Sequence, residues 1–139
     1  ASGKPLPAGL LEAVLMQLAI EIVTDGEGAA RVGRIEVSEA ASATEAERVA
    51  RAVANSPLVK TALFGRDPNW GRIAQAAGAA LVGEDLEEIG AESIEAAELG
   101  ADVPEAEIGL RLGRGEHRAH VWFSDLGYEY VRINAEYTT

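Results

Sequence analysis

A carboxylate placed between two glycines is the first group in this sequence that could bind a ligand. Glu27 lies in the segment Thr24-Asp25-Gly26-Glu27-Gly28-Ala29, where two glycines leave little side-chain bulk around the backbone. A ligand can approach such a turn closely, and the carboxylate can accept hydrogen bonds from an ammonium group. A glutamate in a turn is also commonly a solvated surface residue. The residue pattern alone leaves both interpretations open.

Two polar residues near the C-terminus are the second candidates. Asn134 offers an amide donor and acceptor, and Thr139 offers a hydroxyl group. Chain ends are normally frayed, so a tail without a ligand is the alternative. A binding role needs an anchored tail, for which Tyr128, Tyr130 and Tyr137 are suitable anchors. We therefore expect Tyr130 and Ile133 to be buried. We also expect Asn134 to reach the same polar cavity as Glu27.

Two further groups of residues could be read as functional or as structural. The segment Arg66-Asp67-Pro68-Asn69-Trp70-Gly71-Arg72 could shape a pocket, but Asp-Pro-Asn is typical of a turn that starts a helix. We expect Trp70 to fill the core and assign no ligand contacts to this segment. His117 and His120 are spaced so that they fall on opposite faces of a strand. No cluster in the sequence has metal-ligand spacing, so we expect neither a metal nor another cofactor.

Composition limits the class of protein. A chain of 139 residues with 47% hydrophobic and 25% charged residues fits one globular domain covering residues 1–139. The net charge of −11 would repel a phosphate backbone, so we do not expect nucleic-acid binding. The apolar runs are too short to cross a membrane. The lack of cysteine is compatible with the cytoplasmic location that we expect.

The hydrophobic pattern predicts helices alternating with strands. An amphipathic helix is expected over Leu10 to Val23, and a strand over Arg31 to Val37. Capping boxes that begin at Ser42 or at Thr44 precede a helix running to about Ala54. Such alternation is typical of a mixed α/β domain.

The second half of the chain continues this alternation. The apolar run Leu58 to Phe64 predicts a buried strand, and the small residues of Gly71 to Val82 predict a closely packed helix. Alternating apolar residues from Ala106 to Phe123, interrupted by a glycine-rich turn, predict a β-hairpin. Asp125 as an N-cap favours a helix in the remaining segment.

Three motifs, in this order along the chain, closely resemble those of the ornithine acetyltransferase family, also called bifunctional glutamate N-acetyltransferase. The motifs are Thr24 to Ala29, Asn55 to Ile73 and Tyr128 to Thr139. The resemblance implies a layered α/β fold like that of the N-terminal-nucleophile hydrolases. It also implies that Glu27, Asn134 and Thr139 contact the substrate, because these positions match residues of the family that do so.

The resemblance also implies a reaction. The family moves an acetyl group from N2-acetylornithine to glutamate through an acyl-threonine intermediate, in arginine biosynthesis, and some members also use acetyl-CoA as donor. Its precursors cut themselves before the nucleophilic threonine, which lies in an Ala-Thr-Met context that is absent from this sequence. We therefore expect this chain to be the C-terminal part of the second (beta) chain. Its expected partner is the alpha chain of the same precursor, in a hetero-oligomer of processed chains.

Two other functions stay open at this stage. A related acyltransferase of a specialised pathway, such as antibiotic synthesis, would share the same motifs. A non-catalytic acidic α/β interaction module is the interpretation that the residues favour without the resemblance, since no nucleophile with a neighbouring base is recognisable among them.

Overall fold

A four-stranded sheet in the order β2-β3-β1-β4 forms the centre of the molecule. The computed structural model describes residue 7 and residues 9–83 and 89–136. The strands are β1 (Val32–Ala40), β2 (Ile94–Glu95), β3 (Glu105–Arg111) and β4 (His117–Ser124). β1 pairs in parallel with β3 and antiparallel with β4, while β2 pairs antiparallel with β3. The predicted mixed α/β fold is confirmed.

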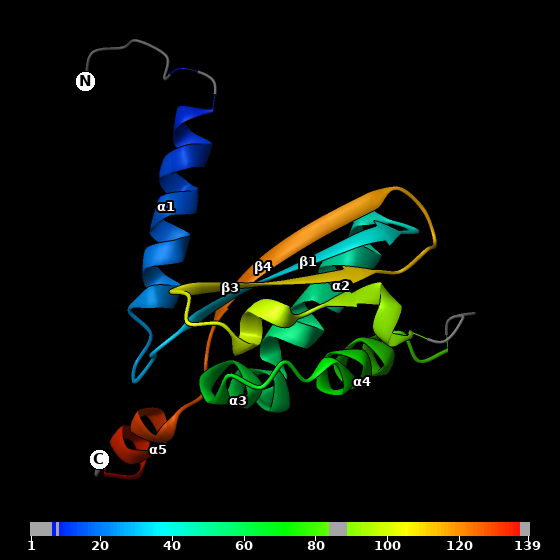
Figure 1. Cartoon of the computed structure of the whole chain (residues 1–139). Coiled ribbons are helices and arrows are strands. Elements are labelled where there is room, and N and C mark those ends of the chain that lie inside the picture. The colour runs from blue at the N-terminus through cyan, green and yellow to red at the C-terminus, as the bar shows by residue number, and fades with distance from the viewer. Residues whose placement is uncertain (1–6, 8, 84–88, 137–139) are drawn as a thin grey trace.

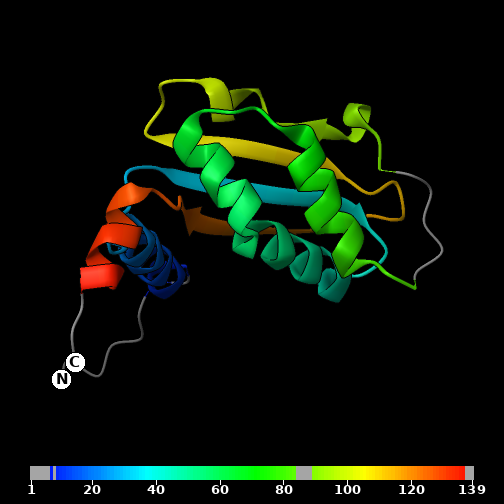
Figure 2. The same ribbon diagram turned by 90° about the horizontal axis from the view of Figure 1, so that it is seen from below.

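The described residues form five α-helices, which are unevenly distributed around this sheet. Three of them, α2 (Ala43–Asn55), α3 (Pro57–Gly65) and α4 (Trp70–Ala80), cover one face of the sheet (Figures 1 and 2). The other two, α1 (Leu10–Thr24) and α5 (Tyr128–Glu136), lie at one end of it in both views. Short 3-10 helices, η1 (Ala91–Ser93) and η2 (Ala97–Gly100), flank β2. Within residues 9–83 and 89–136, no helix is both long and apolar enough to cross a membrane.

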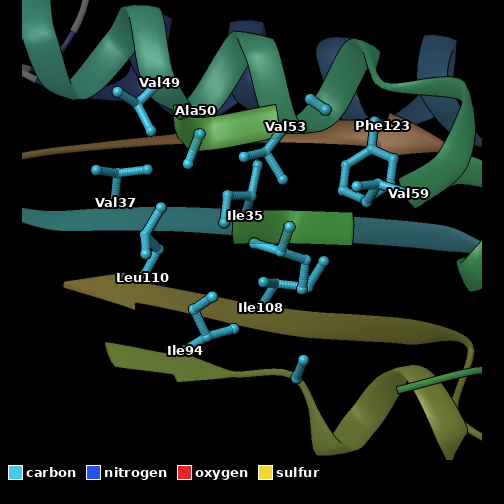
Figure 3. Packing of buried hydrophobic residues seen from close by; sticks show 14 of the residues in the cluster. Ile35, Val37, Val49, Ala50, Val53, Val59, Ile94, Ile108, Leu110 and Phe123 are labelled. Atoms are coloured by element: carbon cyan, nitrogen blue, oxygen red, sulfur yellow. The ribbon is translucent and has the colours of Figure 1, made fainter. Parts of the chain in front are cut away.

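The core lies between the sheet and the three covering helices. Ile35 and Val37 of β1 point toward the side chains of α2 (Figure 3), and both are fully buried. Arg34 and Glu36 alternate with them and therefore lie on the opposite face. The N-terminus of α2 is held by Ser42, whose Oγ accepts a hydrogen bond from the backbone nitrogen of Glu45 at 3.1 Å. Of the two predicted capping boxes, the structure uses the one that begins at Ser42.

The strand predicted over Leu58 to Phe64 is wrong, because this segment is helix α3. Ser56 caps the helix, with its Oγ accepting from the backbone nitrogen of Val59, and Pro57 occupies its first turn. Proline is favoured there, because the first backbone N–H groups of a helix have no partner within it. A short apolar run suits a buried helix as well as a buried strand, and Ser-Pro at its start was the signal that distinguished them.

The predicted hairpin is also wrong, because β3 and β4 are separated by β1. The glycine-rich loop after β3 passes around the end of β1, where the nitrogens of Arg114 and Gly115 donate to Glu39 O at 2.7 and 2.9 Å. Arg114 Nε also lies 3.1 Å from Glu45 Oε1 at the start of α2. The alternation correctly predicted both strands, but the partner between them comes from residues 32–40, far away in the sequence.

Candidate functional site

The loop between α1 and β1 places Glu27 next to α5. Asn134, on α5, donates from Nδ2 to Glu27 Oε2 at 3.3 Å and to the carbonyl oxygen of Tyr130 at 2.8 Å. The expected proximity of Glu27 and Asn134 is therefore confirmed, across 107 positions of sequence. Both side chains are exposed rather than enclosed in this structure. The substrate role of this pair stays a prediction.

Gly28 explains how a helix can lie so close to this loop. Its φ of +71° is a left-handed conformation that favours glycine. A Cβ at this position would overlap the backbone nitrogen of Tyr130 and lie 2.8 Å from Tyr130 Cα. The backbone of α5 therefore rests directly on Gly28, beside the Glu27 carboxylate.

Asp125 does not cap α5, contrary to the expectation from sequence, because the helix begins three residues later at Tyr128. Its carboxylate is buried and accepts from the backbone nitrogen of Ala30 through Oδ1, at 3.0 Å. The acidic residue thus holds the loop that contains Glu27 instead of the first turn of the helix.

The contacts made by the described part of the tail, which extends to residue 136, differ from those predicted. Tyr130 is 42% exposed and Ile133 is only partly buried, so the expectation that both are buried is wrong. Tyr128 is exposed as well, at 81%, although its ring meets that of the half-buried Phe64 of α3 edge to face, with centroids 5.4 Å apart. Tyr137 and Thr139 lie outside the described residues.

Charged groups around the pair are arranged along α5. Arg132 donates to Glu129 Oε2 at 2.8 Å and to Glu136 Oε2 at 3.3 Å. The hydrogen bond from Arg132, together with its positive charge, lowers the pKa of the Glu129 carboxyl. The exposed Glu27 carboxylate accepts its hydrogen bond from the neutral amide of Asn134.

The segment from Arg66 to Arg72 connects α3 to α4, as the turn signal in the sequence predicted. Arg66 ends α3 with φ +55° and pairs with Asp102 at 2.5 Å, and Asn69 caps α4 by accepting from the backbone nitrogen of Arg72. Trp70 is 48% exposed, so the expectation that it fills the core is wrong. It occupies the first position of α4, on the surface.

Other polar groups lie away from the Glu27–Asn134 pair. A groove of about 320 Å³ on the open face of the sheet is lined by four glutamates and Arg34, which pairs with Glu36 and Glu107. His120 packs edge to face on Trp122, with ring centroids 4.8 Å apart. In the part of the chain that the structure describes, no group of three or more His, Cys, Asp or Glu side chains is placed to hold a metal ion.

Sequence reasoning missed two residues that shape this region. Arg31 is buried, with its guanidinium bound to backbone carbonyl groups, and no role was predicted for its side chain. Gly28 was recognised only as a flexible neighbour of Glu27. A charged residue directly before a buried strand is the signal that could have identified Arg31, because charged side chains are rarely buried without partners.

Comparisons with known proteins agree on one family. The model of the ArgJ family matches residues 7–139. Glutamate N-acetyltransferase of Methanopyrus kandleri is 45% identical over 147 residues, which cover 93% of this chain and 38% of that protein. The arginine biosynthesis bifunctional protein ArgJ of Methylococcus capsulatus is 47% identical over 146 residues, covering 93% and 36%.

A solved structure gives the same result for the fold. The crystal structure of the arginine biosynthesis bifunctional protein ArgJ from Bacillus halodurans superposes with a TM-score of 0.79 at 32% identity. The match covers 99% of this chain and 73% of that one. By contrast, the chain spans only 36–38% of the length of the two curated relatives above.

Proposed function

We propose that this chain, which belongs to the ArgJ family, is part of an acyltransferase that moves an acetyl group from N2-acetylornithine to glutamate. The observation that carries the proposal is the family match over residues 7–139, together with the contact between Glu27 and Asn134. The relatives are named for glutamate N-acetylation and arginine biosynthesis. These names favour the arginine pathway over a specialised one.

In the proposed reaction, a threonine outside this sequence is the nucleophile. Its hydroxyl oxygen attacks the acetyl carbon, the carbon–nitrogen bond breaks, and ornithine leaves with the proton on its amine. The amino group of glutamate then attacks the acyl-threonine, which forms N-acetylglutamate and restores the hydroxyl. Covalent catalysis of this kind divides one difficult transfer into two easier steps. Donors on the alpha chain of the same precursor would stabilise the oxyanion.

The role proposed for this chain is recognition of the substrate. The Glu27 carboxylate would pair with a substrate amino group, since it is accessible and carries a negative charge. Asn134 would orient that carboxylate through the 3.3 Å hydrogen bond and offer its amide oxygen to the ligand. Thr139 would complete the set from the end of the tail.

Acetyl transfer can be measured in the full enzyme that contains this chain and in the chain alone. The full enzyme should acetylate glutamate from acetylornithine, and acetylornithine alone should leave one acetyl group on a threonine, visible by intact mass. The purified 139-residue chain should transfer none at any concentration. Sustained activity of the chain alone, lost on mutation of a residue within it, would contradict the placement of the nucleophile.

Substitution of Glu27 tests the proposed role of this chain. Glu27→Ala in the full enzyme should weaken kcat/KM for acetylornithine by about 1.5–3 kcal/mol, the range for a hydrogen bond to a charged group. Glu107→Ala, which removes an exposed glutamate on the open face of the sheet, is the matched control and should have no effect. Unchanged kinetics for Glu27→Ala with both substrates would overturn the assignment.

The tail gives a second test of the same assignment. Deleting Thr138 and Thr139 from the full enzyme should reduce substrate affinity while leaving the fold intact, because the core residues lie between Ile35 and Phe123. The KM for acetylornithine and the circular dichroism spectrum measure these two effects separately. A truncated enzyme with unchanged KM would remove Thr139 from the site.

A further inference from the structure

We infer that Asp125 and Arg31 are positioning residues that fix the separation of Glu27 and Asn134. This inference rests on the proposed function, because it gives these residues a purpose only if that pair binds the substrate. Both act through the loop of residues 26–31, and neither is the partner in the hydrogen bond between Glu27 and Asn134.

Asp125 joins the two backbone segments that carry the pair. Its Oδ1 accepts from Ala30 N at 3.0 Å, and its own backbone nitrogen donates to Arg31 O at 3.0 Å. Glu27 lies three residues before Ala30, and α5 begins three residues after Asp125. One residue therefore sets the loop and the start of the helix relative to each other.

Holding the loop with the buried carboxylate of Asp125 has a cost in stability. The residue is only 4% exposed, and its Oδ2 atom is buried without a hydrogen-bond partner among the residues described. A buried oxygen without a partner costs stability. The negative charge of Asp125 attracts the Arg31 guanidinium and acts to raise its pKa.

Arg31 fastens the same loop to the folded core. Its Nη1 donates to Leu63 O at 2.6 Å and to Leu99 O at 2.9 Å, and its Nη2 donates to Ala101 O at 2.8 Å. These carbonyls lie near the end of α3 and at the end of η2. Burial lowers the pKa of Arg31, and Asp125 opposes that effect. A lysine could not reproduce this planar fork of donors.

The contact of Gly28 with α5 completes the arrangement. The loop is held to the core on one side by Arg31 and to the start of the tail by Asp125. The absence of a Cβ at Gly28 lets the loop approach the helix backbone at Tyr130. Asn134 lies nine residues beyond Asp125, on the helix that begins at Tyr128. A small rotation at Asp125 therefore moves the Asn134 amide away from Glu27.

Nuclear magnetic resonance of the 139-residue chain tests this without any substrate. In the wild type, protonation of Glu27 on lowering the pH should shift the side-chain amide signals of Asn134, and Glu27→Gln should remove this titration. Asp125→Ala and Arg31→Lys should each reduce its amplitude by more than half while the core amide signals keep their dispersion. Asp125→Asn, which retains an acceptor for Ala30 N, should keep the amplitude of the Asn134 titration close to that of the wild type.

Glu107→Ala is the control and should leave the Asn134 titration unchanged. If Asp125→Ala unfolds the chain, Arg31→Lys decides the question, because it keeps the charge and removes only part of the hydrogen bonding. The inference is overturned if a folded Asp125→Ala or Arg31→Lys variant keeps the full titration.

Kinetics of the full enzyme separate this inference from the proposed function. Asp125→Ala should raise the KM for acetylornithine by about tenfold with little change in kcat, as expected when a binding group is displaced. Asp125→Asn should recover most of that loss. If the Asn134 titration is lost in Asp125→Ala but KM is unchanged, the positioning holds and the substrate role of the pair fails.

Discussion

The layer of α2, α3 and α4 on the sheet differs from the end of the molecule formed by α1 and α5. α2 alone buries six residues, including Val49 and Val53, whereas α1 and α5 contain no fully buried residue in the structure described. Six large apolar side chains of α1 are 44–74% exposed: Leu10, Leu11, Val14, Leu15, Leu18 and Ile22. The candidate site belongs to the poorly packed region.

The two regions are held together by different kinds of contact. The helices on the sheet are held by an apolar core whose residues lie between Ile35 and Phe123. The end that carries Glu27 and Asn134 is held by a few specific contacts: Asp125 to Ala30, Gly28 to α5, and Phe64 to Tyr128. Because this chain spans 36–38% of the two curated relatives named above, we expect further protein to cover α1 in the full enzyme.

Replacing leucine by alanine in each region should give the largest difference in the free energy of unfolding. Leu63→Ala, at a fully buried position of α3, should destabilise the chain by about 2–5 kcal/mol, because it leaves a cavity. Leu15→Ala, at a position 56% exposed on α1, should stay within about 0.5 kcal/mol. Urea denaturation measures both. Equal losses would mean that α1 is packed in solution, against our description.

Two glycines with left-handed backbone test the contact at the site. Gly113→Ala should cost about 1 kcal/mol, because its φ is +67° but no atom lies within 4 Å of the added Cβ. Gly28→Ala should cost about 2 kcal/mol or more, because the added carbon also displaces α5. Thermal unfolding gives the free energies of unfolding, and the Asn134 amide signals report on α5. Equal costs with unmoved Asn134 signals would refute the close approach.

The smallest effect concerns the charges on α5. Arg132 lowers the pKa of Glu129 in the folded chain, so the stabilisation from this pair is present above the unfolded pKa and is lost as the pH falls through the folded pKa. Arg132→Gln should raise the pKa of Glu129 toward the ordinary value of an exposed glutamate. Carbon-13 titration of the carboxyl group measures it. A pKa that does not move would show that the pair is absent in solution.

The sequence was sufficient to predict elements whose signals lie within a few neighbouring residues. Ser42, Glu45 and a 3.6-residue apolar period defined α2, and Asp-Pro-Asn correctly predicted the start of α4. It was insufficient where the partner is distant: β1 lies between β3 and β4, although the loop after β3 resembles a hairpin turn.

The candidate site shows the same division. Glu27 and Asn134 were predicted to meet from a family resemblance, and they do. The buried Asp125, the carbonyl partners of Arg31 and the exposure of Tyr130 depend on how distant segments pack, which no local pattern records.

The central claim is that Glu27 and Asn134 bind the substrate as one unit, and a double-mutant cycle in the full enzyme tests it most directly. Glu27→Gln, Asn134→Ala and the double variant would be compared by kcat/KM for acetylornithine. We predict that each single change weakens transfer and that the double variant loses less than their sum, with a coupling energy of about 0.5–3 kcal/mol. Strictly additive losses, or single variants with wild-type kinetics, would contradict the account.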